Sequence, residues 1–234
     1  LLITTINAER VQTYREDMAS AAFYLIDSGL SRQVTAQERN FWLSDVSTLF
    51  DTKFEIEPTS KADFKTSEIN RLNKQQAVVR FNGDTNTAEI YHKVSGENNV
   101  LHVSVNKLNE QQIKGIGVLL LDDLSYYRTL AEKQQRLQQI QKFFPFKLTL
   151  QSVNKLQLDT DQKARLYRKD IVIMFRDNTS VENSSIRVLA PTELQDTVVD
   201  LGPIPLFNWF PLNLIISITL ISMFLISLGV YALI

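Results

Sequence analysis

The sequence predicts an α+β fold of two tandem units, each a helix laid on an antiparallel sheet, followed by one transmembrane helix. The closing residues 212–234 contain no Asp, Glu, Lys or Arg. Ahead of them, stretches with helical spacing of apolar residues give way to stretches in which apolar and polar residues alternate. Several of these patterns recur at a constant offset of 94 residues, which indicates an internal duplication.

The C-terminal segment is long enough to cross a membrane. At a helical rise of about 1.5 Å per residue, residues 212–234 would extend roughly 35 Å, and the hydrocarbon core of a bilayer is roughly 30 Å thick. Trp209 and Phe210 stand where an interfacial belt of aromatic side chains is expected. We expect residues 206–234 to be a transmembrane helix in contact with lipid. A buried core helix is the alternative, but such helices rarely stay apolar on every face.

The charges before this segment predict its orientation. Between Val188 and Pro211 there are three acids but no Lys or Arg. Because Lys and Arg near a membrane helix are retained on the cytoplasmic side, the body of the chain is expected on the other side.

The first six residues are apolar apart from two threonines, and no basic region precedes them. They lack the parts of a complete signal peptide. We expect residues 1–6 to be the outer end of a first transmembrane helix, with an ordinary first helical turn as the alternative.

A helix is expected over residues 8–29, with Gly29 as its stop. Val11, Met18 and Leu25 fall seven residues apart, and Tyr14 occupies the other seam position of the same stripe. The stripe can pack on the chain's own sheet or form the seam of a homodimer, and the pattern alone leaves both open.

Residues 7–121 are expected to hold this helix and the first α/β unit. A helix over residues 36–50 precedes candidate strands at 54–57, 76–81, 88–94 and 100–105. The apolar run 116–121 is expected to add a last strand. Asp122 and Asp123 then precede a helical pattern over residues 124–144, where we expect them to cap the helix rather than bind a metal.

The second unit is expected over residues 122–205, because its patterns repeat those of the first. The helix end and strand at residues 49–56 match residues 143–150, and Arg71-Leu72 matches Arg165-Leu166. The strand Val78-Val79-Arg80-Phe81 matches Val172-Ile173-Met174-Phe175 at the same offset. Agreement in helix end, loop length and strands favours duplication over coincidence.

The composition excludes several classes of function. A net charge of −1 with interspersed signs gives no basic surface for nucleic acid, and the lack of cysteine excludes disulfides and thiol catalysis. The two histidines, His92 and His102, lie on candidate strands, so we expect no catalytic, cofactor or metal site. Alternation predicts that His102 is exposed; a role as a pH sensor is the alternative.

Four segments carry a resemblance to a known family. They are residues 8–10, 22–26, 54–61 and the step Gly202-Pro203-Ile204-Pro205-Leu206 before the C-terminal segment. Together they resemble the extracytoplasmic region of RstB-type (BfmS-like) two-component sensor histidine kinases. The Gly-Pro-x-Pro step is the most specific part.

The resemblance implies the periplasmic sensor domain and second transmembrane helix of a bacterial inner-membrane protein. Its units would be PAS-like in general character, the protein would be a homodimer, and a cytoplasmic part would use ATP and Mg²⁺ to phosphorylate an OmpR-type response regulator. No catalytic apparatus of that kind is recognisable in these residues. The signal would be a periplasmic protein or a small molecule.

Gly202, Pro203, Ile204 and Pro205 are expected to be the signal-relay connector. Each proline fixes its own φ and restricts the residue before it, so little slack is expected between sheet and membrane. A structural or adaptor protein of the bacterial envelope, without kinase activity, is the alternative function.

Overall fold

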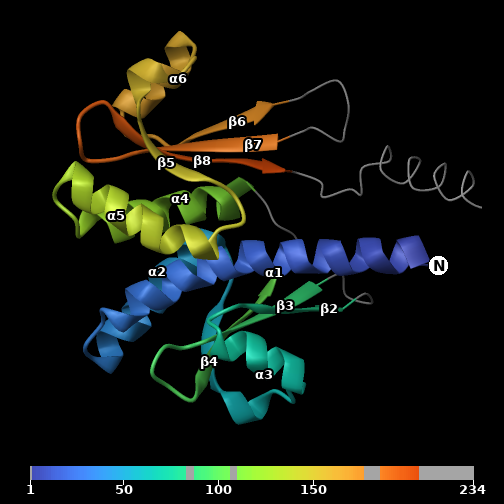
Figure 1. The fold of residues 1–234 in the computed structure, drawn as a ribbon. Helices are drawn as coiled ribbons and strands as arrows, with labels where there is room; N and C mark the ends of the chain where they lie inside the picture. Colours follow the sequence, from blue (N-terminus) through green and yellow to red (C-terminus); the bar gives the residue numbers. More distant parts are fainter. Residues whose placement is uncertain (1, 83–86, 106–109, 177–184, 206–234) are drawn as a thin grey trace, which may run out of the picture.

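The computed structural model describes residues 2–82, 87–105, 110–176 and 185–205. These residues form two antiparallel sheets with a layer of helices between them (Figure 1). The helices of that layer are α1 (Leu2–Ser31), α2 (Ala36–Phe50), α4 (Glu110–Ser125) and α5 (Leu130–Ile140). The predicted α+β class, with helices on each of two antiparallel sheets, is confirmed.

The two sheets share one topology. The first has the order β1-β4-β3-β2 and the second β5-β8-β7-β6. In chain order the strands are β1 (Phe54–Pro58), β2 (Val78–Asn82), β3 (Thr87–Lys93), β4 (Asn99–Val105), β5 (Leu148–Ser152), β6 (Val172–Arg176), β7 (Ser185–Pro191) and β8 (Thr197–Pro205). Short 3-10 turns cover Thr59–Lys61, Gln141–Phe143 and Val153–Lys155.

Each sheet also carries one short helix on its outer face, away from the helical layer (Figure 1). Helix α3 (Thr66–Asn73) covers the first sheet, where Leu72 packs on Val78 and Val100. Helix α6 (Thr160–Tyr167) covers the second, where Leu166 packs in a small cluster with Val172 and Leu189. The rest of each outer face stays open to polar side chains.

The predicted repeat extends to local details of the backbone. Thr35 and Thr129 each accept a hydrogen bond from the backbone of a glutamate three residues on, which closes a capping box at the start of α2 and of α5. Gln75 and Lys169, 94 residues apart, both have positive φ, at 58° and 69°. From β3 and β7 onward the offset becomes 98 residues.

Helix α4 belongs to this repeat. It ends at Ser125, and α1 ends 94 residues earlier at Ser31. Structural equivalence therefore groups α4 with the second unit, and the division expected between residues 121 and 122 falls inside it.

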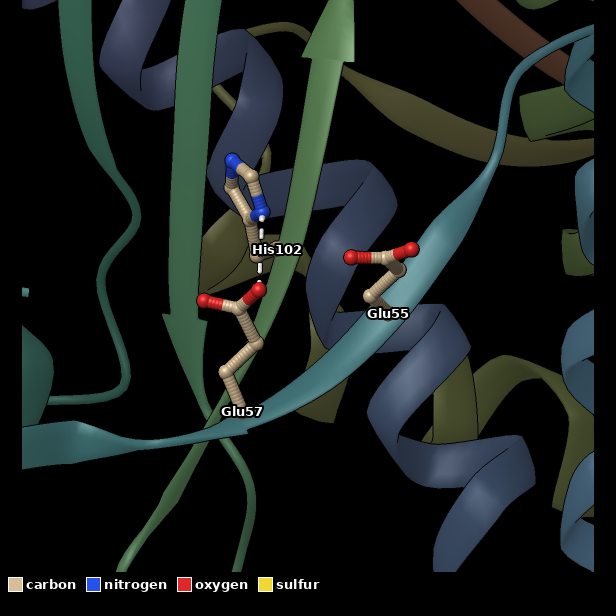
Figure 2. Close-up of side chains that lie close together, drawn as sticks. All are labelled: Glu55, Glu57 and His102. Atoms are coloured by element: carbon tan, nitrogen blue, oxygen red, sulfur yellow. Dashed lines mark ion pairs between the residues drawn. The ribbon is translucent and has the colours of Figure 1, made fainter. Parts of the chain in front are cut away.

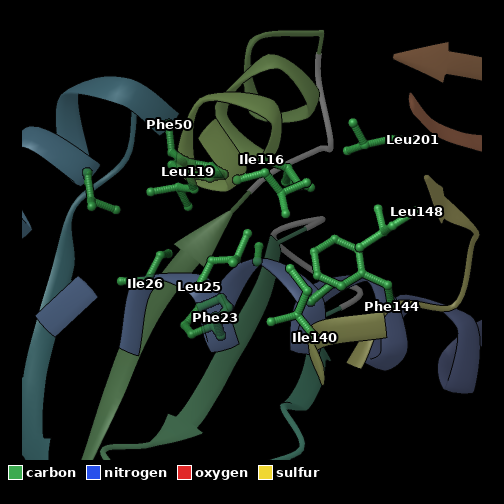
Figure 3. Close-up of a cluster of buried hydrophobic side chains, with 14 of the residues drawn as sticks. Phe23, Leu25, Ile26, Phe50, Ile116, Leu119, Ile140, Phe144, Leu148 and Leu201 are labelled. Carbon is green, nitrogen blue, oxygen red and sulfur yellow. The ribbon is translucent and has the colours of Figure 1, made fainter. Parts of the chain in front are cut away.

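One hydrophobic core joins the two units (Figure 3). Leu25 and Phe23 of α1 meet Ile116 and Leu119 of α4, and the same cluster includes inward-facing residues of both sheets. Among these are Phe54, Leu101 and Val103 from the first sheet and Leu148, Val188 and Leu201 from the second. The units therefore share buried apolar area and are expected to unfold together.

The strand predicted at 116–121 is wrong, because these residues lie within α4. Ile116, Leu119, Leu120 and Leu124 are buried, and their spacing is that of one face of a helix. Asp122 and Asp123 consequently lie near the end of α4 and do not cap the next helix, whose N-cap is Thr129. The single helix expected over residues 124–144 is replaced by the end of α4, a turn and α5.

Gly29 does not stop α1, which runs on to Ser31. A Cβ added at Gly29 would lie 2.1 Å from the Trp42 ring. Glycine is needed there because α2 places an indole ring directly against α1.

Within the described residues, no helix combines the length and apolar character needed to cross a membrane. The expected span over residues 206–234, with Trp209 and Phe210, lies outside the described residues. Helix α1 begins at Leu2 and includes the stretch expected to end a first transmembrane helix.

Candidate functional site

The open part of the first sheet's outer face holds a cluster of acidic residues around a histidine. Glu55 and Glu57 lie on β1, Glu89 on β3 and His102 on the intervening strand β4. Their side chains share one face because side chains two apart on a strand point the same way. Glu55 is the register partner of His102, and Figure 2 shows how Glu55, Glu57 and His102 lie together.

His102 is the centre of this polar cluster. Its Nε2 lies 2.5 Å from Glu89 Oε2, and its Nδ1 lies 3.9 Å from Glu57 Oε1. The Tyr91 ring stacks on the imidazole at 4.6 Å between centroids, which fixes the plane of the ring. Ser104 donates a hydrogen bond of 2.6 Å to Glu89. The predicted exposure of His102 is therefore only partial, since 19% of its side chain is accessible.

Two carboxylates of the cluster, those of Glu89 and Glu55, are held in their charged form. Burial alone would raise the pKa of Glu89, but the hydrogen bonds from Ser104 and His102 outweigh it, so the pKa lies below its usual value. The ammonium of Lys53, 2.5 Å away, lowers the pKa of Glu55. Lys61 makes a similar contact with Glu57. Both lysines are largely exposed and can swing away without breaking packing.

This geometry has the capacity to bind a metal ion. The ligand atoms of Glu55, Glu57 and His102 lie within 4.8 Å of one another, close enough for one divalent cation. A mixed imidazole and carboxylate set suits Zn²⁺ or Mn²⁺ better than Ca²⁺.

The second sheet has a polar group at the equivalent positions. Gln151, Asp200 and Arg187 correspond to Glu57, His102 and Glu89. Arg187 makes two hydrogen bonds to Asp200, at 2.7 and 2.6 Å, and Gln151 donates a third at 2.5 Å. The Asp200 side chain is only 5% exposed.

A second polar group crosses the helical layer between the units. The buried Asp123 of α4 accepts hydrogen bonds from Arg136 of α5 at 2.7 and 2.9 Å and from Arg32 of α1 at 2.9 Å. Ser28 of α1 donates to the same carboxylate at 3.2 Å. Burial would raise the pKa of Asp123, but the two guanidinium groups outweigh it and lower the pKa. Any movement of α1 relative to α4 and α5 must rearrange this ion network.

The expected connector forms part of the second sheet. Gly202, Pro203, Ile204 and Pro205 are the last residues of β8, and Ile204 is buried opposite Ile186 of β7. Gly202 has a φ of 120°, and a Cβ there would lie 2.9 Å from the Ile186 carbonyl oxygen. The ladder has a register shift at Ile186 and Val188, so this stretch is a bulged strand end rather than a free linker.

Of the expected dimer seam, Leu25 is buried in the chain's own core at 1% exposure. Val11, Tyr14 and Met18 lie on α1, but their side chains are outside the described part of the structure. His92, the other histidine, faces the helical layer and is fully buried near Phe23. Burial lowers the pKa of His92 to about 4.

The sequence did not reveal the contacts of Asp123 and Glu89. Asp123 was interpreted as a helix cap, and no neighbouring residue indicates that it pairs with arginines 91 residues before it and 13 residues after it. Glu89 has the alternation of a half-buried strand, but only the pairing of β3 with β4 places it beside His102. Comparison with known proteins found no matching family, no similar curated protein and no similar solved structure.

Proposed function

We propose that this chain is the periplasmic sensor and transmembrane signalling portion of a two-component sensor histidine kinase of the bacterial inner membrane. The observation that carries the proposal is the placement of the start of α1 and the end of β8. Helix α1 starts, and strand β8 ends, on the same side of the molecule (Figure 1). A domain held between two membrane segments needs this arrangement, and the uncharged residues 212–234 follow β8.

Two structural features support signalling rather than simple anchoring. The residues expected to relay the signal are hydrogen-bonded into the second sheet, so a movement of that sheet moves the exit of the chain directly. The entry helix α1 is coupled to α4 and α5 through the buried Asp123 network. A change in how the two units pack would therefore reach both ends of the domain.

The homodimer, the response regulator and the ATP- and Mg²⁺-dependent kinase part belong to the same proposal. The cluster around His102 is the part of the surface best suited to sense the environment, because it combines an imidazole with carboxylates close enough to hold one divalent cation. Its equivalent in the second sheet has its charges compensated by Arg187.

Two experiments test the proposal. The first uses the natural lack of cysteine: Lys155→Cys places one thiol on the exposed turn after β5. In intact spheroplasts, a membrane-impermeant maleimide is expected to label this variant. Labelling only after lysis would contradict a periplasmic location.

The second experiment joins residue 234 to the cytoplasmic kinase region of an established sensor and measures kinase output in membranes. Replacing Pro203 and Pro205 with glycine loosens the exit of β8 and is expected to shift that output, with the domain still folded. Pro58→Gly, at the exposed end of β1, is the matched control. Unchanged output in the double variant would argue for the alternative, a structural envelope protein without signalling.

A further inference from the structure

A buried lysine lines a small cavity in the second unit. Lys133 of α5 is 1% exposed, and its Nζ donates a hydrogen bond of 2.5 Å to the carbonyl oxygen of Leu124 at the end of α4. The cavity has a volume of about 290 Å³. Its lining includes Lys133, Lys169, Leu121, Leu124, Pro191 and Glu193.

Lys133 is a buried cation whose described polar contact is with a backbone carbonyl. Among the described residues, no carboxylate forms an ion pair with it, although buried charges in proteins are normally paired. Its ammonium has three N–H donors, and the Leu124 carbonyl accepts one. The equivalent residue of the first unit, Arg39, has a partner, since it forms an ion pair with Glu97 at 2.5 Å.

The cavity contains a second cation. Lys169 follows α6, and its Nζ donates a hydrogen bond of 2.6 Å to the carbonyl oxygen of Thr192. Two lysines therefore face one small space whose other walls include Leu121, Leu124 and Pro191. Such a space favours an anion with an apolar body.

Two features limit the charge of that anion. The carbonyl groups at the end of α4 give this side of the cavity a partial negative charge. Glu193, exposed at the lining, adds a carboxylate that no described ion pair links to either lysine. Both disfavour a dianion such as phosphate, whereas a single carboxylate would be tolerated.

We infer that the cavity between α4, α5 and the turn after β7 binds a short-chain monocarboxylate, with Lys133 and Lys169 holding its carboxylate. Bound there, the ligand lies against Leu124, the residue next to Asp123, and so touches the network that joins α4 and α5 to α1. That this binding is a signal rests on the proposed sensor function, whereas the binding itself does not.

Calorimetric titration of the complete 234-residue chain with sodium butyrate at pH 7, against sodium chloride, tests the inference. We expect saturable binding that weakens at least tenfold in Lys169→Gln, a substitution at an exposed position that keeps the aliphatic stem. Lys133→Met, which removes the buried charge, is expected to abolish it. Lys155→Gln, at an exposed lysine outside the cavity, is the matched control and should bind as the unmodified chain does.

If Lys133→Met does not fold, Lys169→Gln decides alone. Absence of saturable butyrate binding, equal binding in Lys169→Gln, or tighter binding of inorganic phosphate than of butyrate would each overturn the inference.

The kinase fusion separates this inference from the proposed function. Butyrate binding without any change in kinase output would uphold the cavity and count against the sensor proposal. A change in output with the glycine variants, but no butyrate binding, would uphold the sensor and overturn the cavity.

Discussion

The two units place opposite chemistry at the same positions of the same sheet. In the first, the imidazole of His102 lies among carboxylates; in the second, the carboxylate of Asp200 lies between Arg187 and Gln151. The charge of Asp200 stays compensated, because an arginine side chain remains charged at any ordinary pH. The cationic neighbours of the first group include two lysines that are largely exposed. The two units thus share one scaffold, with an imidazole among carboxylates on one outer face and a compensated carboxylate on the other.

The helix pairs of the two units, α1 with α2 and α4 with α5, also carry different residues at equivalent positions. In the first unit Gly29 of α1 packs against Trp42 of α2, and the indole donates a hydrogen bond to the Ile26 carbonyl. At the equivalent positions of the second unit, Asp123 of α4 pairs with Arg136 of α5. One contact depends on the absence of a side chain and the other on a buried ion pair. Only the second reaches across to the other unit, through Arg32.

The largest expected effect comes from breaking that ion pair. Asp123→Ala leaves the guanidinium of Arg136, 11% exposed, without its partner and should lower the free energy of unfolding by about 4 kcal/mol. Asp122→Ala is the matched control: its side chain is 37% exposed, and a cost below about 1 kcal/mol is expected. Urea unfolding followed by circular dichroism measures both. Equal losses of free energy of unfolding in the two variants would contradict a distinct stabilising role for the buried Asp123 network.

His92 gives the next largest effect, at acid pH. Its equivalent in the second unit is Ala190, so only the first sheet buries an imidazole. The pKa of His92 falls from 6.5 to about 4 on folding, so the unfolded chain binds the proton first and stability is lost as pH falls from 6.5 towards 4. At about 1.4 kcal/mol per pH unit, the loss approaches about 3 kcal/mol.

His92→Leu should remove this part of the acid dependence, as measured by urea unfolding at several pH values between 7 and 4. His102→Gln, which changes the partly exposed histidine, should keep it. An unchanged pH profile in His92→Leu would rule out His92 as the source.

The outer-face groups should respond unequally to loss of one partner. Arg187→Met leaves the nearly buried Asp200 with Gln151 and should cost about 2 kcal/mol. Glu89→Gln in the first sheet should cost less than about 1 kcal/mol, because Glu89 is 31% exposed and an amide can still accept from Ser104. Thermal unfolding of the two variants checks the contrast, and a larger loss in Glu89→Gln would reverse the assignment of roles.

The smallest effect concerns a feature that the units share. Thr35→Ala and Thr129→Ala each remove one side of a capping box and should each cost about 1 kcal/mol. Since one core spans both units, both variants are expected to show a single unfolding transition. Two transitions in either variant would mean that the units unfold separately.

The local sequence pattern was sufficient to predict the repeat and most of the strands. The alternation around Phe54 and Ile56 and the offset between Val78 and Val172 both correspond to elements of the structure. Such signals are readable because a strand exposes one face and buries the other along a continuous stretch. The strand prediction at 116–121 was wrong because short apolar runs occur both in buried strands and in buried helices. The length of the run alone separates the two poorly.

Tertiary structure decided everything that depends on two distant segments. His102 and Glu89 are 13 residues apart, yet their contact exists only because β3 and β4 pair in one register. Asp123 meets Arg32 only because one core packs α4 against α1, and Lys133 lies over a cavity only because α5 follows the end of α4. The sequence by itself determined the duplication, the alternation of the strands and the uncharged C-terminal segment, since each is encoded in neighbouring residues. Packing decided which of the charged side chains meet.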